Sequence, residues 1–514
     1  GAIMKKFLIP CLWLIVILPV ALAQAPQGKL IEDHWDAAFL EGGRCGYFHS
    51  QIRELPGKDG GKLYESKLEM RLILKRYMSV VNMRMDSEMT EDEQGKIKSF
   101  KVIQFLDKGQ AVQEGEVKDG KLWMKLPGVN EPRQMPWNDS VIGVYRQERL
   151  PSILKAKPSD KFEYLNFEAS LMQAIKMKAE LLPEEEIEVL AVDSKDPAKF
   201  SQGRKKLKKL EVTPDKISLF GSALQLPKMV AWVGDDLVAV RSRMEMPGIG
   251  AIILYRTTKE IATKEDDNVA VLPDIGLNNM IELDKRIPNV HLLEEATYHF
   301  KLDKEDGLQA FQTSGRQKVK KLDDGGYELT VLGNVAVQAD EPSKEFLESS
   351  YFLESNNAEV KKLSEKAVGD ETDPLKKARK IERFVHENMK GSSSVGFATA
   401  GQIAKDLQGD CRQHAMLMAA MCRAAGIPSR TALGLVYVEE PKSRKPQFGF
   451  HMWTEVYVRG GWVAMDATLG QGLVGPGHLK IADHSWQDQQ TLAPLLPVIR
   501  VMGKLQMKVV SAKE

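Results

Sequence analysis

The sequence predicts a multidomain α+β protein: β-rich N-terminal domains that form a curved antiparallel sheet or open barrel, then a C-terminal domain of helices on an antiparallel sheet. Up to about residue 259, apolar and polar residues alternate in short segments separated by turns that carry Gly, Asp or Asn. Segments 358–368, 374–389 and 410–425 instead place apolar residues at helical spacing. The 514 residues, 43% hydrophobic and 28% charged, suffice for about two to four domains.

The first 23 residues have the three parts of a secretory signal peptide. Lys5 and Lys6 supply the positive charge, residues 7–20 are almost entirely apolar, and small residues lead up to Ala23. We therefore expect cleavage after Ala23 and an exported protein in the periplasm, the cell envelope or the extracellular space. The alternative is an uncleaved segment that forms the chain's sole contact with a membrane, although the apolar run is shorter than the roughly 20 residues that span a bilayer.

Residues 24–265 are expected to form the β-rich N-terminal domain. Within it, residues 162–188 place Leu171, Ile175 and Leu181 on one face at helical spacing, which predicts a helix across the mouth of the sheet. No side chain in this domain identifies a ligand, so we expect it to be structural. Alternation predicts strands at residues 67–74, 99–106, 113–117, 121–126, 238–245 and 250–255.

Three further units are expected after this domain. A charged segment at 263–267 leads into a small β module, residues 266–350, with strands at 296–302 and 326–331. Residues 351–475 form the expected catalytic domain; its helix at 374–389 has Asp373 as its N-cap and Pro374 at its first position. Residues 476–514 form a C-terminal extension that ends in a strand at 505–510.

Cys411 stands at the start of the predicted helix 410–425, directly after its N-cap Asp410. Unpaired N–H groups and the positive end of the helix dipole favour a thiolate there, by up to about 1 kcal/mol. The Asp410 carboxylate opposes ionisation of the thiol, so a nucleophilic Cys411 also requires an imidazolium partner.

His451 and Asp466 can supply that partner and its support. His451 precedes a predicted strand at 453–458, Gly460 and Gly461 make a hairpin turn, and the returning strand 462–466 brings Asp466 back beside His451. A helix packed on this hairpin would deliver Cys411 to the free ring nitrogen. The three residues then form the nucleophile, base and orienting carboxylate that acyl transfer requires.

Five segments, at 409–415, 425–430, 434–437, 451–456 and 461–468, together resemble the transglutaminase-like superfamily of cysteine enzymes. The resemblance covers roughly the last third of the chain, and it implies a papain-like fold in which Cys411 is the nucleophile, His451 the base and Asp466 the orienting residue. One departure is Ala467, where the family often has Pro; this change alters a turn and leaves the carboxylate in place.

Other residues near the motif have more than one interpretation. The spacing of Cys411 and His414 also suits zinc, with His451 and Asp466 as further ligands, but no second Cys-x-x-Cys or His-rich segment reinforces a metal site. The resemblance makes His414 a neighbour of the nucleophile, so we expect no metal and no cofactor. The possible oxyanion donors are the backbone N–H of Cys411 and the side-chain amides of Gln402 and Gln413. His414 and Trp453 are possible pocket residues, although an aromatic residue beside a hairpin is more often part of the core.

The cysteine count fits an available thiol. Loss of the signal peptide removes Cys11 and leaves Cys45, Cys411 and Cys422, an odd number that forms no disulfide framework. Cys422, within the predicted helix, is assigned to the core. Cys45 is free or pairs across domains.

Taken together, these features predict an exported cysteine-dependent acyl-transfer enzyme that forms a thioester at Cys411 and hydrolyses or transamidates a protein or peptide substrate. A net charge of +1 argues against nucleic acid as a main partner. The competing class is a non-enzymatic envelope binding or scaffold protein with a vestigial triad. The sequence leaves the oligomeric state open.

Overall fold

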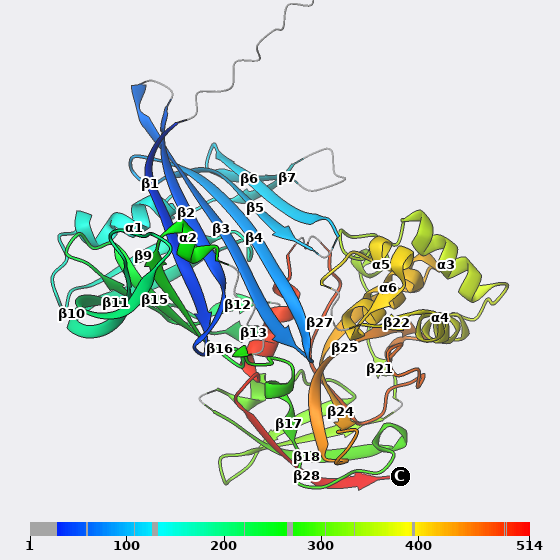
Figure 1. The fold of residues 1–514 in the computed structure, drawn as a ribbon. Coiled ribbons are helices and arrows are strands. Elements are labelled where there is room, and N and C mark those ends of the chain that lie inside the picture. The colour runs from blue at the N-terminus through cyan, green and yellow to red at the C-terminus, as the bar shows by residue number, and fades with distance from the viewer. Residues whose placement is uncertain are drawn as a thin grey trace, which may run out of the picture.

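The computed structural model describes residues 28–57, 60–106, 108–125, 132–219, 222–264, 271–303, 305–333, 335–392, 396–487, 489 and 491–514. The predicted signal peptide lies outside these residues, as do positions 265–267 of the charged segment. The predicted fold class is confirmed: a large curved antiparallel sheet comes first, and helices packed on a second sheet follow it (Figure 1).

The N-terminal sheet has 14 strands in the order β8-β7-β6-β5-β4-β3-β2-β1-β16-β15-β14-β11-β10-β9. Every neighbouring pair is antiparallel. Its strands are β1 Lys29–Leu40, β2 Gly43–Pro56, β3 Lys62–Arg76, β4 Ser79–Asp92, β5 Ile97–Phe105, β6 Gln110–Lys118, β7 Lys121–Lys125, β8 Arg133–Pro136, β9 Lys161–Glu168, β10 Gln173–Val192, β11 Phe200–Pro214, β14 Met229–Val233, β15 Ala239–Met246 and β16 Gly250–Thr257. A separate hairpin joins β12 Ile217–Leu219 to β13 Ser222–Leu224.

The sheet curls so that its two ends approach each other. Helix α1, Val144–Ile153, connects the edge strands β8 and β9, and the Phe100 ring of β5 lies 5.1 Å from the Phe167 ring of β9. Glu91 at the end of β4 is buried and accepts hydrogen bonds from the first two backbone N–H groups of α1 beyond Val144, at 2.9 and 2.8 Å. This carboxylate therefore fixes the helix to the sheet.

The helix predicted at 162–188 is wrong, because this segment forms β9 and the long strand β10. Along the first part of β10, the apolar residues Ile175, Met177, Ala179 and Leu181 are buried, while the charged residues between them are mostly exposed. That period of two buries one face of a strand. A short helix α2, Lys259–Ala262, follows the sheet.

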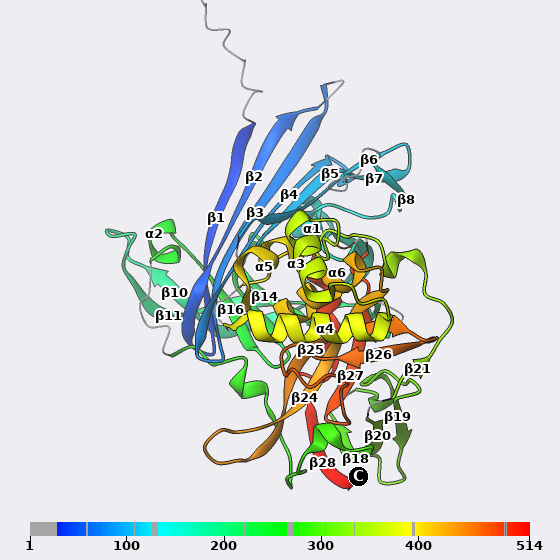
Figure 2. The same ribbon diagram turned by 90° about the vertical axis from the view of Figure 1, so that its right-hand side faces the viewer.

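In the described C-terminal residues, helices pack on one face of a six-stranded sheet, and Figure 2 shows these helices in front of its strands. The predicted helices are present as α3 Ala358–Val368, α4 Pro374–Asn388 and α6 Cys411–Ala424, and α5 Ala400–Asp406 joins them. The sheet holds β21 Val337–Gln338, β26 Gly461–Met465, β25 Pro446–Val458, β24 Ser429–Glu439 and β27 His478–His484, and β17 Ile281–Glu282 pairs with β25. Two short parallel strands, β22 Lys390–Gly391 and β23 Gln408–Gly409, lead into α6.

A four-stranded sheet packs on the other side of this unit. It has the order β19-β20-β18-β28, with β19 Gln317–Lys321, β20 Tyr327–Leu332, β18 Glu295–Leu302 and β28 Leu505–Lys513. The strand expected at the C-terminal end thus lies beside β18. Tyr298 of β18 and Phe448 of β25 share one apolar core, so the six-stranded sheet lies between helices and a second sheet.

Candidate active site

Helix α6 begins at Cys411, and its first turn is closed by a capping box. Asp410 accepts the N–H of Arg412 at 2.9 Å, and Gln413 accepts the N–H of Asp410 at 3.1 Å. Gly409 before the cap has φ 152°, and a Cβ there would lie 2.4 Å from the Gln413 side chain. The Cys411 side chain therefore sits at the positive end of a well-capped helix, and the residue is only 8% exposed.

His451, on β25, lies beside both of its predicted partners. Its Nε2 donates to Oδ2 of Asp466 at 2.7 Å, and the Cys411 sulfur lies near enough to the ring to raise its pKa. Since Nε2 faces the carboxylate, Nδ1 is the nitrogen left for the sulfur. Burial lowers the pKa of His451, but Asp466 and Cys411 raise it more, and the net pKa lies well above its ordinary value. The structure therefore brings the three predicted residues together.

Asp466 follows the last residue of β26, which pairs with Thr454 of β25. The carboxylate is fully buried, and its Oδ1 accepts the backbone N–H of Thr468 at 2.8 Å. Burial raises the pKa of Asp466, but the contacts with His451 and His478 lower it by more, so the net pKa lies well below its ordinary value. Asp466 is thus held as a buried, ionised carboxylate.

His478 is a member of the site that the sequence analysis did not identify. It lies on β27, beyond residue 475, and its Nε2 donates to the same Oδ2 of Asp466 at 3.0 Å. Burial lowers the pKa of His478 to about 3, so the ring is neutral. The available sequence signal was the alternation of polar and apolar residues at 478–481 after Gly477, which predicts a strand but does not reveal its neighbour.

The side chains that could ligate a metal in the structure differ from the four residues considered for zinc from the sequence. His451, Asp466 and His478 offer atoms that lie within 4.8 Å of one another, whereas Nδ1 of His414 bonds to the backbone oxygen of Asp410 at 2.7 Å. In the structure, both imidazole contacts to Asp466 have the length of hydrogen bonds. The arrangement fits two N–H donors on one carboxylate.

The remaining residues named for the oxyanion or the pocket lie as follows. Gln413 donates its side-chain N–H to the oxygen of Gly396 at 2.7 Å and also closes the capping box. Gln402 donates to Asp406 on its own helix at 2.8 Å. Trp453 is fully buried, and its ring centroid lies 5.2 Å from that of His478, so it packs behind the histidines.

The other two cysteines in the described part of the chain lie away from this chemistry. Cys45 and Cys422 are buried and, like Cys411, form no disulfide. Burial raises the pKa of Cys45 to about 12 and raises that of Cys422 as well. Neither is suited to act as a thiolate near neutral pH.

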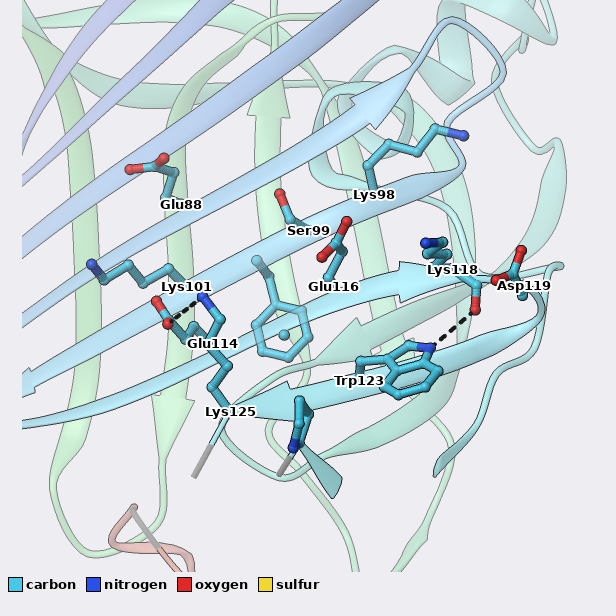
Figure 3. Close-up of a pocket in the computed structure, with 13 residues that line it drawn as sticks. Glu88, Lys98, Ser99, Lys101, Glu114, Glu116, Lys118, Asp119, Trp123 and Lys125 are labelled. Carbon is cyan, nitrogen blue, oxygen red and sulfur yellow. Dashed lines mark hydrogen bonds and ion pairs between the residues drawn. The ribbon is translucent and has the colours of Figure 1, made fainter. Parts of the chain in front are cut away.

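A hollow of about 760 Å³ lies on the N-terminal sheet, over β4 to β7 (Figure 3). Its lining alternates Lys and Glu side chains, and Lys125 pairs with Glu114 at 3.0 Å. The Trp123 indole N–H donates to the backbone oxygen of Lys118 at 3.4 Å. The hollow carries balanced charge and none of the residues of the Cys411 site. Across the described ranges, no helix has the length and apolar character needed to cross a membrane.

Residues 361–467 match the model of the transglutaminase-like superfamily, so the resemblance is confirmed for this part of the chain. An uncharacterized protein of Haemophilus influenzae is 30% identical over 146 residues, which make up 24% of this chain. The chain spans 39% of the length of this curated relative.

Two solved structures show a more distant likeness. The periplasmic domain of TgpA from Pseudomonas aeruginosa matches over 37% of this chain and 87% of that domain, with 14% identity and a TM-score of 0.26. A protein of Cytophaga hutchinsonii, provisionally described as a cysteine protease, matches over 44% of this chain and 84% of its own, with 18% identity and a TM-score of 0.26. These TM-scores are too low for the likeness to bear on function.

Proposed function

We propose that the transglutaminase-like domain is a cysteine-dependent acyl-transfer enzyme that acts on the amide or peptide carbonyl of a protein substrate, in an exported chain. The observation that carries this proposal is the position of His451, which is hydrogen-bonded to Asp466 at 2.7 Å and lies near enough to Cys411 for the sulfur to raise its pKa. The raised pKa of His451 favours an imidazolium next to a thiolate. Export rests on the apolar N-terminal segment, residues 7–20.

In the first step, the Cys411 sulfur attacks the carbonyl carbon and an S–C bond forms. The charge that develops on the carbonyl oxygen meets the backbone N–H of Cys411, one of the first-turn groups that a helix cannot satisfy internally. Collapse of this intermediate breaks the C–N bond, and His451 donates its proton to the leaving amine. The product is a thioester on Cys411, with Asp466 keeping the ring in position throughout.

In the second step, an acceptor attacks the thioester while His451 takes up its proton. The C–S bond breaks and the Cys411 thiolate returns beside the imidazolium. Water as the acceptor gives hydrolysis, and a primary amine gives transamidation. The same residues would catalyse hydrolysis and transamidation, so an experiment is needed to identify the acceptor and the substrate.

The first test is thiol alkylation at pH 6, with the labelled peptide identified by mass spectrometry. We expect rapid labelling of Cys411, slowed about 100-fold or more in His451→Ala because the general base is lost. Labelling of Cys411 no faster than that of Cys45 would refute the proposal and favour a binding protein with a vestigial triad. Digestion of a peptide library with an added amine then distinguishes cleaved fragments from amine adducts.

A further inference from the structure

The turn between β3 and β4 of the N-terminal sheet reaches the start of the helix that carries Cys411. Arg76, the last residue of β3, places its Nη1 2.5 Å from Oδ2 of Asp410, although the two residues are 334 positions apart in the sequence. Both side chains are less than a fifth exposed. In Figure 1 the long blue strands β3 and β4 run down to the strand β25, which carries His451.

The turn itself has a conformation that its residues seldom adopt. Tyr77 and Met78 have φ values of 47° and 64°, which a two-residue hairpin turn normally assigns to Asn or Gly. Their backbone N–H groups donate to the two carboxylate oxygens of Asp274 at 2.8 and 2.7 Å. Asp274 is only 8% exposed, and it also accepts the N–H groups of two residues in its own loop. The strained turn is therefore held in one place, as is common at functional sites.

This anchoring directs the Tyr77 side chain onto the face of β25 that carries His451. A Cβ at Gly276 would lie 2.8 Å from the Tyr77 ring, and one at Gly449 would lie 3.9 Å from its hydroxyl oxygen. Gly449 precedes His451 by two residues, so both face the same side of the strand. Burial raises the pKa of Tyr77, and the nearby charge of Cys411 contributes in the same direction. Met78 beside it is 71% exposed.

Arg76 also alters the charge balance around the thiol. The carboxylate of Asp410 disfavours an anion on its neighbour Cys411. Two guanidinium groups offset it: Arg412 contacts Asp410 at 2.9 Å and Arg76 at 2.5 Å. Burial raises the pKa of Asp410, but these two groups hold it well below its usual range. Two cations against one carboxylate leave a net positive charge beside Cys411.

We propose that the N-terminal sheet completes the active site: its β3–β4 turn supplies Arg76 as a positioning residue that favours the Cys411 thiolate, and Tyr77 as a wall that limits which acyl donors reach the sulfur. This inference rests on the proposed function. It makes the N-terminal sheet and the transglutaminase-like domain one catalytic unit, because neither part alone contains all the groups.

The charge contribution is tested by the alkylation rate of Cys411 as a function of pH in the full chain. Removing a cation near the thiol in Arg76→Met should move the midpoint of the profile up by about one pH unit, and Arg76→Lys should restore most of it. Arg243→Met is the matched control, because Arg243 belongs to the same sheet and pairs with a carboxylate, Glu245, elsewhere. The other charged and titratable side chains around Cys411 are unchanged in all of these variants, so they cannot cause a difference between the profiles. They are Asp410, Arg412, His414, His451, Asp466 and Tyr77.

A profile for folded Arg76→Met that coincides with that of the unaltered chain would overturn the charge contribution. The shift is measured on the sulfur and needs no turnover. It is therefore distinct from failure of the proposed function, which appears as slow, His451-independent labelling of the unaltered chain.

The wall is tested with variants that suit the turn. Tyr77→Gly and Met78→Gly both place glycine at a positive φ, which removes the backbone strain of the turn, and urea denaturation shows that each variant is folded before its labelling is measured. Only Tyr77→Gly removes the side chain near His451. We expect it to increase the rate with a bulky maleimide several-fold relative to iodoacetamide, whereas Met78→Gly leaves that ratio unchanged. Equal ratios in the two variants would show that Tyr77 does not restrict access.

Discussion

At the residue scale, the central feature is that Oδ2 of Asp466 receives N–H groups from two histidines, His451 at 2.7 Å and His478 at 3.0 Å. The two rings have opposite pKa shifts in one buried space. His451 gains proton affinity from the carboxylate and the sulfur despite its burial, while burial lowers the pKa of His478 to about 3. His478 therefore orients the carboxylate as a neutral donor, and His451 alone is available to exchange a proton.

Replacing His478 by Phe should expose this orienting role. The ring volume is kept, but the buried Asp466 carboxylate loses one of its donors, which should cost about 1.5–3 kcal/mol of stability and slow alkylation of Cys411. Urea denaturation at pH 7 and the labelling rate measure the two effects. His34→Phe, on the partly exposed surface of β1, is the control and should change neither. Equal stability and labelling in both variants would mean that His451 and the backbone suffice to hold Asp466.

The sequence predicted the close site residues but not the distant ones. Cys411 lies at a helix start, and His451 and Asp466 lie on one hairpin, so these local patterns and the resemblance to the transglutaminase-like superfamily located the three residues. His478 and Arg76 have no such local signal. Arg76 reaches Asp410 across 334 residues, and the turn after it carries Tyr77 instead of the glycine or asparagine that announces a hairpin.

At the element scale, β24 and β27 approach each other closely at Gly434. This residue pairs with His451 on one side and with Lys480 of β27 on the other. A Cβ there would lie 2.0 Å from the backbone oxygen of Leu479 and 2.9 Å from the Trp453 ring. The absence of a side chain thus allows the strand with His478 to lie beside the strand that pairs with His451.

We therefore expect Gly434→Ala to be strongly destabilising. The new methyl group must displace either the β27 backbone or Trp453, at a cost of about 3 kcal/mol, and the shift of β27 should also move His478 away from Asp466. Gly391→Ala is the control, because a Cβ at that glycine meets no atom within 4 Å. Thermal unfolding compares the two variants, and similar melting temperatures would show that the sheet adjusts without strain.

The wrong helix at 162–188 has a physical cause at the same scale. Leu171, Ile175 and Leu181 happen to fit a helical face, and the Ala, Met, Glu and Lys residues between them have high helix propensity. In the folded chain, β10 instead pairs along its length with β11, and the alternation from Ile175 to Leu181 buries one face of the sheet. Tertiary pairing thus overrides local propensity. The helices at 374–389 and 410–425 were predictable because their cap residues and their periodicity agreed.

At the scale of the whole molecule, several polar contacts join the N-terminal sheet to the C-terminal unit besides Arg76. Lys108 pairs with Asp406 at 2.8 Å, and the Tyr351 hydroxyl donates to the backbone oxygen of Gln110 at 2.7 Å. Such contacts between units distant in the sequence follow from the fold and have no local pattern. The two kinds of architecture were therefore predictable from the sequence, whereas the contacts between them were not.

The two parts of the molecule also contain a buried carboxyl and a partly buried imidazole with opposite responses to pH. In the N-terminal sheet, burial raises the pKa of Glu91 from 4.5 to about 7. In the C-terminal unit, burial lowers the pKa of His484 from 6.5 to about 4. The folded sheet thus prefers a protonated carboxyl, and the folded C-terminal unit prefers a neutral imidazole.

The linkage gives each part its own pH window. Stability from protonated Glu91 is present below pH 4.5 and is lost as the pH rises through about 7, whereas stability from neutral His484 is present above pH 6.5 and is lost as the pH falls towards 4. Each shift corresponds to about 3 kcal/mol. We measure the unfolding temperature by calorimetry between pH 4.5 and 7.5. Glu91→Gln should remove the loss of stability of the N-terminal sheet as the pH rises, and His484→Gln should remove the loss of stability of the C-terminal unit as the pH falls. If both variants keep the pH dependence of the unaltered chain, neither group determines how its stability changes with pH.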